Sequence, residues 1–301
     1  MTTEAPTVSG DEMDKPRVFS IPYLETLITK SCNLHCDGCQ NYTNYGFKGV
    51  MDFDTLSQDI RRWGKRITPN VYRILGGEPL LHPQLADFIR LAADVWPQAK
   101  RIVVTNGLLA ERCDTIVPAL AETGTSVHLT IHSNDPKYLE KLRPGITALK
   151  KWAAQSVQIG IGDSRNFIRT YKGIGRGMRP FNDDPVKSWD ICTARNCLNI
   201  VDSKLWKCPT ISMLRDALEK FGLENSPDWK RYLAYKGLDV NSTDNELAAF
   251  LGKGPEDICS ICPSVRPTYQ KDVFNVDFNR NAEKLEVDYP TVDIGAFLNS
   301  C

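Results

Sequence analysis

The chain has 301 residues, of which 42% are apolar and 25% are charged, and this ordinary globular balance excludes disorder of the whole chain. The 37 Lys and Arg residues are matched by 37 Asp and Glu residues, so no basic field exists to hold a nucleic acid or an anionic membrane. The sequence also lacks a run of about 18 apolar residues and an apolar signal segment, so we expect a cytoplasmic protein with no nucleic-acid or membrane partner.

Residues 1–19 are polar and aperiodic, which predicts a disordered tail. From residue 20 onward, short β-rich runs alternate with segments of helical spacing. We expect strands at 24–29, 71–75, 101–105, 127–131 and 157–161, and helices at about 53–67, 85–95, 111–122 and 146–154. Parallel neighbours need a crossover of a dozen or more residues, so this alternation predicts a parallel sheet closed into a barrel or partial barrel over residues 20–185.

The rhythm of strands and helices fails after about residue 185. Two short strands, 198–201 and 204–207, flank Asp202-Ser203 as in a hairpin, and amphipathic helices follow at 212–221 and 245–251. Five of the ten cysteines lie between residues 186 and 270. We therefore expect a small cysteine-rich domain at 186–270, followed by a polar C-terminal tail at 271–301.

Ten cysteines in a cytoplasmic protein point to metal binding or catalysis, because the cytosol keeps thiols reduced. Cys32, Cys36 and Cys39 follow the first expected strand with the spacing Cys-x3-Cys-x2-Cys. Three thiolates on a four-iron cube leave one iron open to an outside ligand. A zinc loop with His35 as fourth ligand is the alternative, although such close neighbours could hardly close a tetrahedron.

The spacing and position of this loop resemble those of the radical S-adenosylmethionine (SAM) superfamily. The resemblance implies that Cys32, Cys36 and Cys39 hold a [4Fe-4S] cluster whose open iron is chelated by SAM. It further implies that reductive cleavage of SAM gives a 5′-deoxyadenosyl radical, which abstracts hydrogen from a substrate. The fold that goes with these motifs is α/β, a partial (βα)6 TIM-like barrel.

Further polar residues stand where the strands are expected to end, at the mouth that such barrels use for ligands. The resemblance assigns Gly76-Gly77-Glu78 to the SAM amino group, and a Gly-Gly turn after a strand is otherwise only a turn. Candidates for the SAM ribose and carboxylate are Asn106 and Ser133, and Ile161 could flank the adenine or belong to the barrel core. Candidates for substrate contacts are His132, Asp163 and Arg176, with a structural imidazole, a helix cap and a solvated loop as the respective alternatives.

The second group of cysteines resembles the twitch domain, a shortened SPASM domain that holds an auxiliary [4Fe-4S] cluster in part of this superfamily. Matching its spacing puts Ser203 at the template's glycine position and selects four ligands, Cys192, Cys208, Cys259 and Cys262. Cys197 then stays free, although the opposite choice, with Cys197 as ligand and Cys192 free, remains open. Structural zinc is the alternative metal for four thiolates in this arrangement.

An auxiliary cluster favours oxidation of a substrate radical to a ketone, whereas a free thiol favours epimerisation by returning a hydrogen atom to carbon. Cys197 is the candidate donor, with an inert buried thiol as the alternative. Only about twenty residues precede the expected barrel, so we expect a small sugar- or aminocyclitol-like substrate, and an electron donor such as flavodoxin or ferredoxin. A peptide maturase, an activase of a partner protein and a non-enzymatic metal protein are the alternatives.

Overall fold

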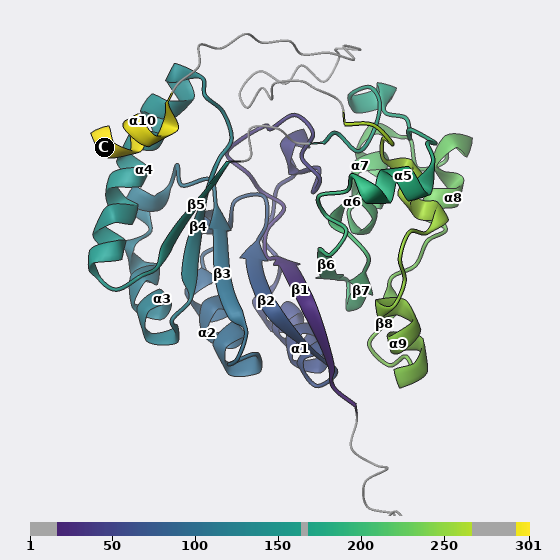
Figure 1. Ribbon diagram of the computed structural model, residues 1–301, viewed down its shortest axis with the longest axis horizontal. Coiled ribbons are helices and arrows are strands. Elements are labelled where there is room, and N and C mark those ends of the chain that lie inside the picture. Colours follow the sequence, from purple (N-terminus) through teal and green to yellow (C-terminus); the bar gives the residue numbers. More distant parts are fainter. Residues whose placement is uncertain (1–16, 164–167, 267–292) are drawn as a thin grey trace, which may run out of the picture.

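The computed structural model describes residues 17–163, 168–266 and 293–301 (Figure 1). Its strands are β1 (Phe19–Leu27), β2 (Ile67–Leu75), β3 (Lys100–Thr105), β4 (Ser126–Ile131), β5 (Ile159–Asp163), β6 (Leu198–Val201), β7 (Lys204–Trp206) and β8 (Leu238–Asp239). In the described part of the chain they form one eight-stranded sheet in the order β5-β4-β3-β2-β1-β6-β7-β8. Strands β1 to β6 run parallel where they pair, and β7 and β8 are antiparallel.

The helices are α1 (Phe53–Gly64), α2 (Leu85–Val95), α3 (Val117–Thr123), α4 (Pro136–Ala154), α5 (Pro185–Asp190), α6 (Pro209–Ser212), α7 (Leu214–Phe221), α8 (Lys230–Leu233), α9 (Asp244–Leu251) and α10 (Ile294–Ser300). Figure 1 shows α1 to α4 along one face of β1–β5, while α5 to α9 gather beyond β1. This is the partial barrel that the alternation of strands and helices predicts, because each parallel pair from β1 to β5 is joined by a crossover that returns over the same face.

Side-chain alternation divides the sheet into two faces. On β4, Val127, Leu129 and Ile131 join the hydrophobic core under the helices, whereas His128 and Thr130 point to the opposite face and line a cavity. A second hydrophobic core packs the C-terminal helices against Tyr42 and Tyr45, which follow the first cysteine loop. The cavity face of the sheet therefore lies between the two cores.

The predicted hairpin is confirmed, and it extends the sheet of the barrel. Asp202 and Ser203 both adopt left-handed φ angles of 50° and 62°, as a two-residue turn of type I′ requires. The first strand of the hairpin, β6, pairs in parallel with β1 through the register Leu24↔Leu198. The sheet thus continues across residue 185, where the rhythm of the sequence changes.

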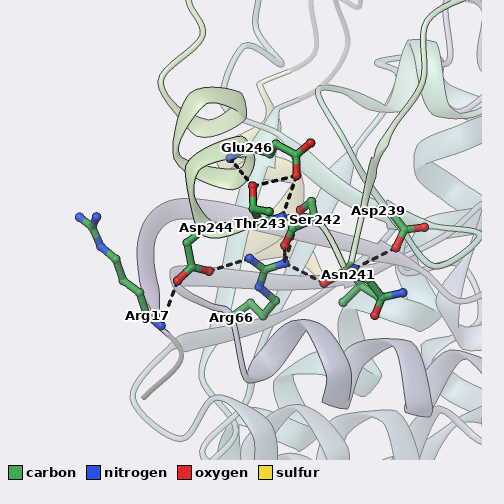
Figure 2. Close-up of polar contacts among 9 residues, drawn as sticks. Arg17, Arg66, Asp239, Asn241, Ser242, Thr243, Asp244 and Glu246 are labelled. Carbon is green, nitrogen blue, oxygen red and sulfur yellow. Dashed lines mark hydrogen bonds and ion pairs between the residues drawn. The ribbon is translucent and has the colours of Figure 1, made fainter. Parts of the chain in front are cut away.

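A polar network fixes the segment around α9 to the end of the sheet at which β2 begins (Figure 2). The Arg66 guanidinium donates to the carbonyl oxygens of Val240 (2.7 Å) and Ser242 (2.5 Å) and forms an ion pair with Asp244 (2.8 Å). Thr243 caps α9 and exchanges hydrogen bonds with Glu246. Arg66 lies just before β2, so this network ties α9 to the barrel strands.

The end of the chain departs from the predicted tail at 271–301. Residues 267–292 lie outside the described residues, but Ile294–Ser300 form helix α10, and Figure 1 shows it beside α4. Phe297 is buried under the Arg143 guanidinium (5.1 Å to the ring centroid), and Lys150 donates to the Leu298 carbonyl (2.9 Å). Within the described residues, no helix is both long and apolar enough to cross a membrane.

Candidate active site

The first cysteine loop leaves the carboxyl end of β1 and enters a cavity of about 330 Å³. Cys32, Cys36 and Cys39 all line this cavity, together with Gly76 and Gly77 from the end of β2. The structure thus brings together the two motifs that the sequence assigns to the cluster and to SAM. The imidazole of His35, the alternative fourth ligand, has its Nδ1 2.9 Å from the Asn44 carbonyl oxygen.

The two glycines let the β2 loop approach the cysteine loop closely. Gly77 N–H donates to the Thr29 carbonyl (2.8 Å), and the Glu78 N–H donates to the Ser31 carbonyl (2.9 Å). A Cβ on Gly77 would lie 2.2 Å from the Ser31 oxygen and 2.9 Å from Cys32 Cβ, so no side chain fits there. The two glycines therefore allow the loops after β1 and β2 to pack against each other, and they leave room for a ligand to approach the backbone.

Glu78 is fully buried and acts as a structural clamp between β2 and β3. Its carboxylate accepts hydrogen bonds from the Thr105 hydroxyl (2.6 Å), the Asn106 N–H (2.9 Å) and the Leu80 N–H (3.1 Å). Burial raises the pKa of Glu78 to about 7, against the opposing effect of these donors. The side chain is absent from the described lining of the cavity, so the structure gives it a role in holding the loops.

A buried ion pair holds the middle of the cysteine loop. The guanidinium of Arg169 donates from Nε to Asp37 Oδ1 (3.1 Å), and a second contact joins its other end to Asp37 Oδ2. Both side chains are almost inaccessible, with 6% and 2% exposure. Asp37 lies between Cys36 and Cys39, so this bidentate pair fixes the loop that carries the thiols.

The remaining predicted ligand residues divide between the cavity and other places. Asn106 and His132 line the cavity, and the Asn106 amide donates to Asn33 (2.7 Å). Ser133 is buried and its hydroxyl accepts from the Asp135 N–H (3.0 Å), outside the described lining. Two further predicted residues are absent from the described lining: Ile161 pairs with Leu129 and is 48% exposed, and Arg176 is exposed in a 3₁₀ turn. The side chain of Asp163 lies outside the described residues.

Four polar residues that line the cavity from the strands were missed by the sequence reasoning: Glu25 on β1, Arg73 on β2, and His128 and Thr130 on β4. The available signal was the presence of charged residues within otherwise apolar parallel strands, which are normally covered on both faces. The small residues Gly160 and Gly162 of β5 lie beside His128, where a Cβ would come within 3.1 and 2.3 Å of its ring. Burial lowers the pKa of His128, with Arg73 acting in the same direction.

Cys197 lies just before β6 and lines the same cavity as the first three cysteines. Its backbone N–H donates to the Ala194 carbonyl (2.9 Å). Burial raises the pKa of the Cys197 thiol, and the nearby Glu25 carboxylate raises it further. The protonated form of this thiol is therefore favoured, and the residue lines the cavity of the first three cysteines.

The other four cysteines of the C-terminal part line a second, small cavity: Cys192, Cys208, Cys259 and Cys262. Apolar side chains of Ile211, Ile258 and Ile261 form much of its wall. Cys197 does not belong to the described lining of this cavity. Burial raises the pKa of Cys262, and Cys208 and the other cysteines of the group add to the rise, so thiolates here need a compensating metal centre.

In the parts of the chain that the structure describes, no three His, Cys, Asp or Glu side chains converge into a site for a single metal ion. A four-iron cube carries each protein ligand on a different iron, so its thiolates surround an open volume. Cys32, Cys36 and Cys39 line one open cavity, which is compatible with such a cube, and the other four cysteines line a second cavity.

Comparisons with known proteins agree with the first of these centres. Residues 26–154 match the model of the Radical SAM superfamily, and this span holds the three cysteines and the Gly-Gly-Glu loop. The chain is 27% identical over 174 residues to a GTP 3′,8-cyclase of Alkaliphilus oremlandii and 32% identical over 130 residues to one of Alkaliphilus metalliredigens. These matches cover 56% and 42% of this chain, and 51% and 40% of the relatives, so the chain spans about half the length of the curated relatives it matches.

Solved structures give matches of low identity. SuiB of Streptococcus suis bound to S-adenosylmethionine is 18% identical, with 47% of this chain and 33% of SuiB covered and a TM-score of 0.39. BtrN in complex with AdoMet and 2-DOIA is 14% identical, with 87% and 96% covered and a TM-score of 0.38. Residues 26–154 therefore form a radical SAM domain, a family that implies a [4Fe-4S] cluster and SAM.

Proposed function

We propose that the protein is a radical SAM enzyme that abstracts hydrogen from a carbinol C–H of a small carbohydrate- or aminocyclitol-like substrate. The observation that carries this proposal is the single cavity lined by Cys32, Cys36 and Cys39, by Gly76-Gly77 and by polar side chains of the sheet. When bound, the cluster and SAM supply reductive cleavage to a 5′-deoxyadenosyl radical. The residues of the chain bind the reactants and decide the fate of the substrate.

The lining of the cavity supports a polar substrate. The sheet contributes hydrogen-bonding groups from Glu25, Arg73, His128 and Thr130 to its floor. Such a lining suits a molecule with several hydroxyl or amino groups.

Cys197 is the proposed hydrogen donor for epimerisation. Its place in the cavity of the first three cysteines supports contact with the substrate, and its raised pKa keeps the sulfur protonated. A substrate carbon radical can take the hydrogen atom of this weak S–H bond from the face opposite to the one first attacked. The thiyl radical left on Cys197 is then reduced to the thiol by one electron from the electron donor and one proton. Oxidation to a ketone is the competing outcome, in which the substrate radical gives up an electron and a proton.

The second cysteine group is proposed to hold an auxiliary [4Fe-4S] cluster of the twitch type. Support comes from the common cavity of Cys192, Cys208, Cys259 and Cys262 and from its apolar wall. Burial raises the pKa of the Cys208 thiol to about 12 and Cys192 adds to the rise, while Lys207 opposes it weakly. The Nζ of Lys207 lies 2.8 Å from Glu256 and 4.5 Å from the Trp189 ring centroid. A flavodoxin or ferredoxin is the proposed electron donor.

The test is anaerobic reconstitution with iron and sulfide, followed by incubation with SAM and dithionite. We expect 5′-deoxyadenosine in the mass spectrum and a change in the paramagnetic spectrum of the reduced protein when SAM is added. Cys36→Ser should abolish both signals, whereas Cys113→Ser, a thiol outside the described cavity lining, should retain them. Failure of the unaltered protein to form 5′-deoxyadenosine would refute the proposed function.

A further inference from the structure

Two charged side chains stand next to each other on the floor of the active-site cavity. Glu25 on β1 and Arg73 on β2 are direct Cα partners in the parallel register, so their side chains leave the sheet on the same face. Both line the cavity that holds the cysteines and Cys197. The mechanism proposed above assigns neither of them a specific role.

The Glu25 carboxylate is buried but only partly satisfied. Its side chain is 6% exposed, and Oε1 accepts a hydrogen bond from the Tyr23 hydroxyl (2.8 Å). A carboxylate offers about four acceptor positions, so most of its capacity stays available to a ligand. Among the described residues no ion pair joins it to Arg73, although the two lie on neighbouring strands.

Arg73 has one buried donor that finds no acceptor among the described residues. Its guanidinium lies 4.8 Å from the centroid of the Tyr23 ring, which holds it by a cation–π contact. Within the described residues, Nε of Arg73 is buried and has no hydrogen-bond partner. A buried donor of this kind is costly unless a ligand satisfies it.

The charge of the floor discriminates between classes of substrate. Among the described residues that line the cavity, Arg73 is the sole Lys or Arg, and Glu25 is the sole Asp or Glu. A polyphosphate would bring several negative charges beside one guanidinium and a buried carboxylate, and the like-charge contact would oppose binding. An uncharged or amino-bearing polyol avoids this repulsion. One of its hydroxyl or amino groups can donate to Glu25 while a neighbouring oxygen accepts from Arg73.

We propose that Glu25 and Arg73 form a recognition pair for a vicinal diol or amino alcohol, with Glu25 accepting from one substituent and Arg73 donating to the oxygen of the next. The pair excludes nucleoside triphosphates, including the GTP after which the related cyclases are named, and Tyr23 positions Glu25 for its task. This inference rests on the proposed function and narrows its substrate class.

The test measures binding to anaerobically reconstituted enzyme saturated with SAM, by calorimetry. The probes are myo-inositol, 2-deoxystreptamine, glucosamine and GTP. We expect at least one of the three polyols to bind and GTP not to bind. Glu25→Gln and Arg73→Gln should each weaken the best polyol by at least about tenfold, and Arg73→Lys should restore only part of the loss because a single ammonium lacks the guanidinium fork.

Two further variants keep the result interpretable. Tyr23→Phe removes only the hydroxyl that holds Glu25, and should weaken binding by a few fold even if Glu25→Gln fails to fold. Arg61→Gln, on the exposed face of α1, should bind the polyol as the unaltered enzyme does. The recognition pair would be overturned if GTP bound or if none of the polyols bound. It would also be overturned if Tyr23→Phe and Arg73→Gln both bound the polyol as tightly as the unaltered enzyme. Formation of 5′-deoxyadenosine by the unaltered enzyme is measured in parallel, and its absence would instead count against the proposed function.

Discussion

Glu78 shows how protein groups can share a side chain that a motif assigns to a ligand. The resemblance assigns its carboxylate to the SAM amino group, and in the structure the Thr105 hydroxyl and two backbone N–H groups also donate to it. The sequence could not reveal these donors, because they come from the turn after its own and from the end of the neighbouring strand β3. Gly76 and Gly77 themselves line the cavity as the motif predicts.

Glu78 should make stability depend on pH. Its pKa in the folded state, about 7, lies above the ordinary value of 4.5, so its stabilising contribution is full below about pH 4.5 and is lost as the pH rises through about 7. We expect the free energy of unfolding of the unaltered protein, relative to Glu78→Gln, to fall by on the order of 3 kcal/mol from about pH 4.5 to 8. Urea unfolding at several pH values measures this difference. Thr105→Val, which removes one donor, should retain the dependence, and parallel curves for the unaltered protein and Glu78→Gln would contradict the assignment.

Cys197 should decide the product. In Cys197→Ala the substrate radical has no thiol to return hydrogen, so we expect the epimer to disappear in favour of other products. A reaction in deuterated water shows this directly, because an exchangeable thiol delivers deuterium to carbon and mass spectrometry detects the added mass. Cys113→Ala is the matched control, since Cys113 contacts the Leu80 carbonyl away from the described cavity lining. Equal deuterium incorporation by Cys197→Ala would remove this residue from the mechanism.

At the scale of elements, the sequence predicted those helix bounds that depend on apolar spacing and on capping residues close in the chain. Helix α2 has the bounds that its apolar spacing indicates, and Asp52 caps α1 through the Thr55 N–H. The helix expected at 111–122 begins only at Val117, because Pro118 lacks an N–H and fits only the first turn, so 3₁₀ turns precede it.

Helix α4 begins at Pro136, ten residues before the expected start at residue 146. The expected start is late because the pair Pro144-Gly145 is typical of a helix end. In the structure Pro144 lies within α4, and Gly145 packs so closely on the loop after β3 that a Cβ would lie 2.0 Å from the Gly107 oxygen. Such long-range contacts also explain the floor of the cavity. Glu25, Arg73 and His128 lie far apart in the sequence, and only the register of the sheet brings them together.

The contact between the loops after β1 and β2 should be sensitive to one methyl group. In Gly77→Ala the added Cβ must displace the Ser31 carbonyl, and with it the loop of Cys32. We expect SAM affinity to fall by roughly tenfold, since about 1.4 kcal/mol of lost binding free energy suffices. Calorimetry on the reconstituted protein measures this affinity. Gly254→Ala, where a Cβ meets nothing within 4 Å, serves as the control, and an unchanged affinity in Gly77→Ala would show that the loop tolerates displacement.

The whole molecule is expected to contain two metal centres. Anaerobically purified protein should contain about eight irons per chain, two cubes of four, and replacing Cys259 and Cys262 together by Ala should halve that number. Iron and zinc analysis of both proteins decides the matter. About four irons accompanied by zinc would refute the auxiliary cluster and favour structural zinc in the second cavity.

Strand β1 has neighbours on both sides, β2 from the barrel and β6 from the cysteine-rich part. A shortened chain that stops at residue 185 would therefore strip one flank of this strand and leave its N–H and C=O groups open to other molecules. Such a fragment should aggregate even though it contains the complete span that matches the superfamily, and light scattering against the full chain would show it. The two parts of the protein are thus joined at the strand from which the first cysteines emerge, so neither half is a natural unit for expression on its own.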